Sequence, residues 1–302
     1  MVAKESEREV KLMSKIYRKV IDTKHHKKYN FHVESFDSAM DVYPTCTTRQ
    51  LTSSQFHDMA HYDYNSNGKG WYGEGINCYE DAVNYLKTGY QPAVDSLKAK
   101  MKINRNGESK RFAFQNSVAG FAPVVPLALK GVPNCMIDMY IKPIKTKVVD
   151  VYYDLTCSAG TSSQTILNNG KVLLSAITEL EMQGYRFNLY AMQSYSDNKS
   201  ADILVVKIKD ASQPMDLKRM SYPLMHTGFF RAIGFDWYSK MPEGKFRGGY
   251  GHAMAYEFDG DELDDAAKKL LGENVIYMSG TKIKEHGEDH IKEVLTNGNS
   301  KN

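Results

Sequence analysis

Residues 147–184, KVVDVYYDLTCSAGTSSQTILNNGKVLLSAITELEMQG, decide the fold of this chain. The stretch from Lys147 to Tyr153 is mostly β-branched and aromatic, which predicts a strand. A loop of small polar residues follows. Apolar residues then recur at helical spacing from Ser163 to Gln183, and Gly184 is a typical helix stop. A strand, a tight loop and a long helix in this order indicate an α/β protein.

The alternation of strands and helices continues to the C-terminal end. Tyr185–Gln193 and Ala201–Lys209 are predicted strands, and the turn sequence SDNKS between them favours a hairpin. The further predicted elements are a helix over 216–233, a strand over 251–258, a helix over 262–271 and a strand over 274–279. The predicted fold class is therefore α/β, with a doubly wound, mostly parallel sheet and an antiparallel edge strand.

The first half of the chain is predicted to be a mainly helical and irregular region, residues 1–143, before an α/β domain over residues 144–302. Apolar residues recur at helical spacing between Glu5 and Thr23, and two more helices are predicted over 79–88 and 93–102. Residues 112–136 mix prolines and glycines with apolar side chains, so we expect a buried, irregular connector there.

Composition excludes several classes of protein. The net charge of +3 does not by itself demand a nucleic-acid partner. No stretch approaches the ~18 apolar residues of a membrane span, and the N-terminal residues are charged, so we expect a cytoplasmic protein without membrane contact. The four cysteines lack the spacing of a zinc site or a disulfide framework.

The loop after the first strand of the second half carries the candidate chemistry. Asp154, Thr156 and Ser158, in the spelling DLTCS, present a carboxylate and two hydroxyls at the carboxyl end of a strand, where α/β sheets bind ligands. Such hard oxygen ligands suit Mg²⁺ or Mn²⁺. Two alternatives stay open. Small polar residues here also cap helices, and a helix N-terminus can hold an anion.

The element order and this spelling resemble the von Willebrand A family, whose metal site is written D-x-S-x-S. The family has a second aspartate, commonly followed by glycine, after the strand on the far side of the site. Here Asp259-Gly260 matches that pattern, and Thr227 is the candidate for the family's threonine. The resemblance implies a divalent ion, Mg²⁺ or Mn²⁺, that binds an Asp or Glu of a protein partner. The implied metal ligands are Asp154, Thr156, Ser158, Thr227 and Asp259.

A second resemblance, to an uncharacterised family of tailed bacteriophages, spans most of residues 71–260. The residues on which this resemblance rests include Trp71-x-Gly73, the apolar connector and the string RAIGF at 231–235. It implies a phage origin, with the infected host's cytoplasm or the virion as the location, and it implies no activity.

These patterns favour a phage-encoded binding or adaptor protein. The alternative is a nucleic-acid-associated phage factor that acts through basic N-terminal residues, Lys24, Lys27 and Lys28. A metal-dependent hydrolase would need a general base beside the ion, and the sequence identifies none. The oligomeric state stays open.

Overall fold

The computed structural model describes residues 14–22, 28–43, 70–103, 112–141, 147–196, 199–239, 241, 254, 258, 260–272 and 275–300. Its main feature is a six-stranded sheet in the order β1-β2-β8-β7-β6-β9. Strands β6, β7 and β9 run parallel to one another, whereas β8 is antiparallel to β7. The strands are β1 (Ser14–Ile21), β2 (Tyr29–Phe36), β6 (Lys147–Asp154), β7 (Tyr185–Ser196), β8 (Ser200–Lys209) and β9 (Val275–Ser279).

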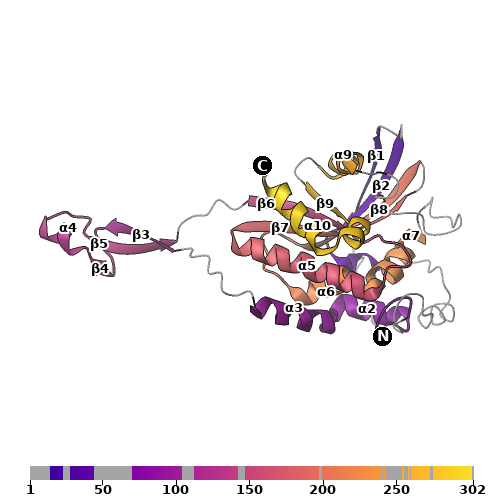
Figure 1. The fold of residues 1–302 in the computed structure, drawn as a ribbon, viewed down its shortest axis with the longest axis horizontal. Helices are drawn as coiled ribbons and strands as arrows, with labels where there is room; N and C mark the ends of the chain where they lie inside the picture. The colour runs from indigo at the N-terminus through magenta and orange to yellow at the C-terminus, as the bar shows by residue number, and fades with distance from the viewer. Residues whose placement is uncertain are drawn as a thin grey trace, which may run out of the picture.

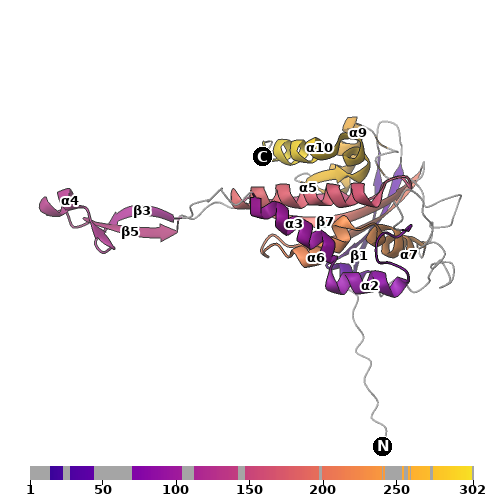
Figure 2. The ribbon, with the colours of Figure 1, turned by 60° about the horizontal axis from the view of Figure 1, so that its bottom comes forward.

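Helices cover the two faces of this sheet unequally (Figures 1 and 2). The larger core lies on one face, where side chains of α5, α6 and α10 meet β6 and β7, and α2 and α3 pack outside them. The smaller core lies on the other face, where α9 covers β1, β2 and β8. The helices are α2 (Tyr79–Thr88), α3 (Gln91–Ile103), α5 (Ser163–Met182), α6 (Leu217–Met225), α7 (Phe235–Ser239), α9 (Gly260–Leu271) and α10 (Gly280–Ser300), with the short η1 (Ala39–Asp41) and the π-helical η3 (Phe229–Gly234).

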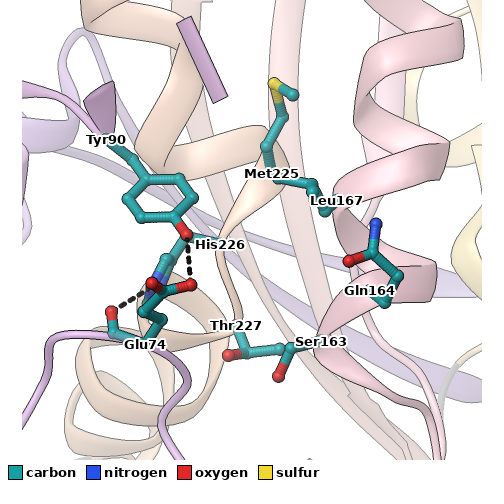
Figure 3. A pocket seen from close by; sticks show the side chains of 8 residues that line it. All are labelled: Glu74, Tyr90, Ser163, Gln164, Leu167, Met225, His226 and Thr227. Atoms are coloured by element: carbon teal, nitrogen blue, oxygen red, sulfur yellow. Dashed lines mark hydrogen bonds between the residues drawn. The ribbon is translucent and has the colours of Figure 1, made fainter. Parts of the chain in front are cut away.

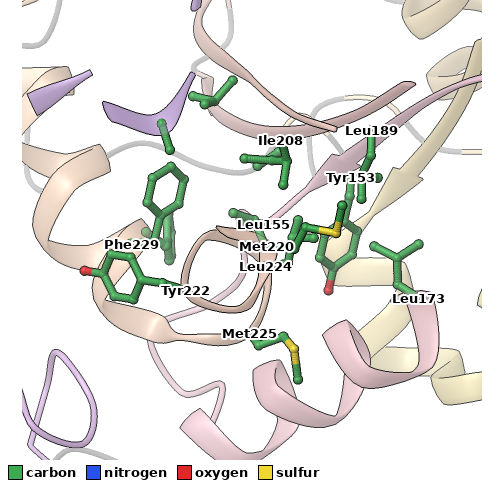
Figure 4. Packing of buried hydrophobic residues seen from close by; sticks show 14 of the residues in the cluster. Tyr153, Leu155, Leu173, Leu189, Ile208, Met220, Tyr222, Leu224, Met225 and Phe229 are labelled. Atoms are coloured by element: carbon green, nitrogen blue, oxygen red, sulfur yellow. The ribbon is translucent and has the colours of Figure 1, made fainter. Parts of the chain in front are cut away.

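Tight packing holds α6 against both α5 and the sheet. Tyr153 and Leu189 of the sheet lie with Leu224 and Met225 of α6 and Leu173 of α5 in one fully buried cluster (Figure 4). The close approach of the two helices requires a glycine in α5. A Cβ atom on Gly170 would lie 2.5 Å from the carbonyl oxygen of Leu224. This packing places the C-terminal end of α6 beside the first turn of α5.

The α/β class predicted from the sequence is confirmed at this level, since a mixed, mostly parallel sheet is packed between helices. The sheet has an antiparallel edge strand, but it is not the strand of the expected hairpin. Strand β8 is antiparallel to β7, as expected for a hairpin, and its other side pairs in parallel with β2. Strand β2 pairs with the antiparallel β1, so the edges are β1 and β9.

The helix expected between Glu5 and Thr23 is wrong for the residues that are described, because Ser14–Ile21 is strand β1. Ile16 and Val20 are four residues apart, a spacing that puts side chains on one side of a helix. It does the same in a strand, because four is a multiple of the two-residue strand repeat. Pairing with β2 over eight residues decides in favour of the strand.

Residues 112–141 form a projecting arm instead of a buried connector (Figure 1). A small sheet in the order β3-β5-β4 and one short helix build it. Its elements are β3 (Phe112–Ser117), β4 (Ala122–Pro123), α4 (Val125–Leu129) and β5 (Met136–Ile141). The predicted boundary at residue 143 lies outside the described residues and stays a prediction, although the large sheet takes β1 and β2 from one side of it and four strands from the other.

Candidate functional site

Asp154 ends β6 at the carboxyl edge of the sheet and is fully buried. Its Oδ1 accepts a hydrogen bond from the backbone N–H of Thr156 at 2.9 Å. Its Oδ2 accepts from the Ser194 hydroxyl of β7 at 2.7 Å and from the Tyr277 hydroxyl of β9 at 2.8 Å. Burial raises the pKa of Asp154 above its usual value, and these hydrogen bonds offset only part of that effect.

The hydroxyls that follow Asp154 are also used within the protein. Thr156 is buried, and its Oγ1 accepts from the backbone N–H of Ser194 at 2.7 Å. The Ser158 Oγ lies 3.3 Å from the Thr161 Oγ1. Ser162 caps α5 by accepting from the backbone N–H of Thr165, so the capping alternative describes this part of the loop.

Thr227 serves a different contact. Its hydroxyl donates to the backbone carbonyl of Tyr72 at 2.8 Å. His226 Nδ1 accepts from the Gly228 N–H, so Nε2 carries the hydrogen and donates to the carbonyl of Glu74 at 2.9 Å. Both residues therefore fasten the segment before α2 to the C-terminal end of α6.

A small hollow lies at this junction, between Glu74 and Tyr90 on one side and Ser163, Gln164 and Thr227 on the other (Figure 3). The Tyr90 hydroxyl donates to the Glu74 carboxylate at 3.2 Å across one wall. The hollow has a volume of about 20 Å³, which is room for one water molecule and too little for an organic ligand.

The second carboxylate of the expected metal site is not placed by the structure. Asp259 lies outside the described residues, as does most of the strand expected over 251–258, where Met254 is helical. On its side away from β7, β6 pairs with β9, which ends at Ser279 and is followed by Gly280. Ser279 is the strand partner of Asp154, and a Cβ on Gly280 would lie 2.5 Å from the Asp154 carbonyl oxygen.

These contacts do not fit a divalent ion held by the expected ligand set. The Asp154 carboxylate accepts hydrogen bonds from three internal donors, and Thr227 is bonded to Tyr72. Within the described part of the chain, no three His, Cys, Asp or Glu side chains gather as a metal site would require. Metal binding stays a prediction, and a titration that tests it is described below.

Arg231 is the cation that lies against this loop, and the sequence reasoning missed it. Its buried guanidinium donates to the carbonyl oxygens of Ala159 at 3.2 Å, Thr161 at 3.0 Å and Trp71 at 2.8 Å. It also lies over the Trp71 ring, 4.1 Å from the centroid. The sequence signal that could have identified Arg231 is its position as a lone arginine within the apolar string GFFRAIGF.

The basic candidates of the alternative hypothesis fall between β1 and β2 in the sequence, where the structure describes a turn at Lys28. Lys24 and Lys27 are outside the described residues. Lys28 is exposed, and its backbone N–H donates to the Asp22 Oδ1 at 2.9 Å. Beside this turn, Arg18 of β1, His32 of β2 and Asp202 of β8 line a surface hollow of about 200 Å³.

The arm carries the most exposed apolar surface. Among the described residues, seven of the eleven large apolar side chains that are exposed lie in it. Phe114 and Phe121 contact each other edge to face, 6.1 Å between ring centroids, yet both face solvent. The seven are Phe114, Val118, Phe121, Val125, Leu129, Val132 and Met139.

The fold and its surfaces thus define an α/β protein with a mixed six-stranded sheet and an apolar arm inserted before β6. Residues 11–299 match the family described as a domain of unknown function, DUF7192, and the chain belongs to that family. No curated protein and no solved structure matches it. Among the described residues, no helix has the length and apolar character to cross a membrane.

Proposed function

We propose that this protein acts by binding, with the α/β body holding the arm against a partner. The observation that carries this proposal is the uncovered apolar surface of residues 112–141. Phe121 is 67% exposed and Leu129 is 83% exposed. Contiguous apolar surface of this kind on a folded protein commonly marks an interaction site.

The arm's size supports this interpretation. Thirty residues are too few to bury a core of their own without disulfides, metals or a partner. In the arm, Phe114 of β3 and Met139 of β5 are paired neighbours on one face of the small sheet. Gln115 and Asp138 are paired on the opposite face. The first face also carries the pair Asn116 and Ile137, and the second carries Ser117 and Met136, so the first face is the more apolar of the two. A sheet with one more apolar face commonly packs against something on that side.

The resemblance to von Willebrand A domains also supports a binding or adaptor role, since that family implies protein contact. The more specific hypothesis is that a metal ion of this protein binds a carboxylate of the partner. Contact through the arm does not require such an ion. A phage origin, with a place in the host cytoplasm or the virion, stays a prediction.

Site-specific photocrosslinking tests the proposal. A photoreactive phenylalanine analogue replaces Phe121 in the arm or, as the matched control, Ile16 on β1, which is 62% exposed. We expect crosslinks from position 121, and few from position 16, in the cells that make the protein. Equal crosslinking at both positions, or none at position 121, would contradict a role of the arm in contact.

The β1–β2 hairpin favours nucleic-acid binding as a second candidate function. Lys15, Arg18 and Lys28 are exposed on or beside it, and the sequence that joins the two strands contains Lys24 and Lys27. If three phosphates are contacted, affinity for a labelled oligonucleotide should fall roughly 40-fold between 50 and 200 mM salt.

Anisotropy titrations with the double variant Arg18→Gln, Lys28→Gln test this candidate. The variant should bind the oligonucleotide more weakly and with a shallower salt dependence than wild type. The matched control removes two exposed charges elsewhere, Lys98→Gln and Lys130→Gln. If the control weakens binding as much as the hairpin variant, the hairpin is not the contact.

A further inference from the structure

We propose that the distal end of the arm docks on an anionic lipid surface. This inference rests on the proposed function of the arm as the contact element, and it adds the chemistry of the partner. It differs from the expectation of no membrane contact, which was based on the lack of a spanning segment. Docking of side chains at a lipid surface requires no such segment.

The distal end of the arm carries exposed apolar side chains. Helix α4 lies at the end farthest from the body (Figure 1). Its Val125 and Leu129 are exposed, as are Val118 and Phe121 in the segment that leads to it. A protein partner would need a groove shaped to these side chains, whereas the apolar layer of a lipid surface accepts them without one.

Charge is distributed as a lipid surface would require. The arm itself, residues 112–141, contains two charged residues, Lys130 and Asp138. The flanking sequences are basic: residues 98–111 contain six Lys or Arg and one Glu, and residues 142–147 contain three Lys and no acid. Basic residues next to a membrane-facing segment are attracted to anionic headgroups. A segment of zero net charge between two basic ones therefore complements an apolar layer beneath a negatively charged surface.

The backbone of the arm limits how deep it can go. Strand β3 pairs with β5 on one side and is an edge of the small sheet on the other. Edge N–H and C=O groups cannot enter hydrocarbon without a partner, because each unsatisfied group costs several kcal/mol. Contact therefore involves the distal side chains, with the strands remaining at headgroup level or in water.

A second copy of this chain is a poorer partner. Strands of six residues are ~20 Å long, and the small sheet is ~10 to 15 Å wide, so its apolar face offers about 250 Å². Two such faces would bury about 500 Å², well below the roughly 1,200 Å² of a stable interface. The basic flanks of the two copies would also repel each other.

Vesicle co-sedimentation of the full-length protein tests the inference. The vesicles contain phosphatidylcholine alone or with about a third phosphatidylglycerol. We expect at least tenfold tighter binding to the anionic vesicles, and at least a tenfold loss of that binding in the double variant Phe121→Ser, Leu129→Ser. The matched control, Ile16→Ser with Val148→Ser, changes two exposed apolar residues of the body, 62% and 56% exposed, and should bind as wild type.

A fluorescent reporter gives a second readout. In a Phe121→Trp variant, anionic vesicles should shift the tryptophan emission to the blue relative to wild type, in which Trp237 is buried and Trp71 packs against Arg231, so that both contribute a constant background. An absent shift, vesicle binding that survives the arm variant, or no binding to anionic vesicles would each overturn the lipid assignment. If position 121 then still crosslinks to a protein, or the arm variant dissociates a dimer, the arm remains a contact element. If position 121 forms no crosslink either, the proposed function fails as well.

Discussion

Replacing Arg231 with methionine is expected to lower the free energy of unfolding by about 3 kcal/mol. The guanidinium is buried and donates to three backbone carbonyls, those of Trp71, Ala159 and Thr161. Methionine fills much of the same volume but leaves these carbonyls without their donor. It also removes the contact of the cation with the Trp71 ring. We expect the free energy lost with these hydrogen bonds and the ring contact to exceed the desolvation cost that is saved when the buried charge is removed.

Urea unfolding of two further variants tests whether the hydrogen bonds of the guanidinium cause this destabilisation. Arg231→Lys keeps the charge but cannot present the planar fork of donors, so it should be destabilised almost as much as the methionine variant. Arg219→Met removes an exposed arginine of α6 and should change stability by less than about 0.5 kcal/mol. A methionine variant at position 231 within about 1 kcal/mol of wild type would show that these hydrogen bonds contribute little.

Asp154→Ala is expected to cost about 3 kcal/mol, because it leaves the buried donors of Thr156, Ser194 and Tyr277 without an acceptor. The pKa of Asp154 is raised in the folded state, so the folded protein favours the neutral carboxyl. Its contribution is therefore fully present below the unfolded pKa of about 3.9, and is lost as the pH rises through the folded pKa. Asp154→Asn does not titrate, so its stability relative to wild type should improve as the pH rises above about 4.

Unfolding curves at several pH values measure this difference. The matched control is Asp150→Ala on the same strand, where the half-buried carboxylate accepts from Asn188 at 2.7 Å and its loss should cost less. A stability difference between wild type and Asp154→Asn that is independent of pH would contradict the raised pKa.

Calorimetric titration of Mg²⁺ and Mn²⁺ into the same variants separates the hydrogen-bonded interpretation from the metal hypothesis. Saturable binding to chelator-treated wild type, lost in Asp154→Ala, would establish a metal site in spite of the contacts seen here. Thermal stability that is unaffected by either ion would support Asp154 as a hydrogen-bonded part of the sheet edge.

Local patterns were sufficient for much of the α/β body. Helix α2 spans the predicted residues 79–88, and Gly89 after it has the positive φ, 75°, that glycine adopts most easily. Strand β6 and helix α5 agree with the predicted ranges within one residue at each end. Each of these elements is specified by its own periodicity and by the residues at its ends, which is information within a short window.

Local sequence patterns gave wrong predictions where one pattern is compatible with two kinds of secondary structure. The spacing of Ile16 and Val20 suits a helix and a strand, and pairing with a distant partner settled it. The apolar, proline-containing residues of the arm were predicted to be buried because apolar residues usually are. Their exposure follows from where the chain places them, which composition does not encode.

The sequence by itself determined the fold class, the position of Asp154 at the end of a strand, and the helix that follows its loop. Only the tertiary structure decided which residues surround Asp154. Ser194, Tyr277 and Ser279 reach it from strands β7 and β9, which are 40 to 125 residues away along the chain, and Arg231 reaches the adjoining loop from η3. The physical reason is that spacing along a chain fixes neighbours within an element, whereas the pairing of strands fixes neighbours across a sheet.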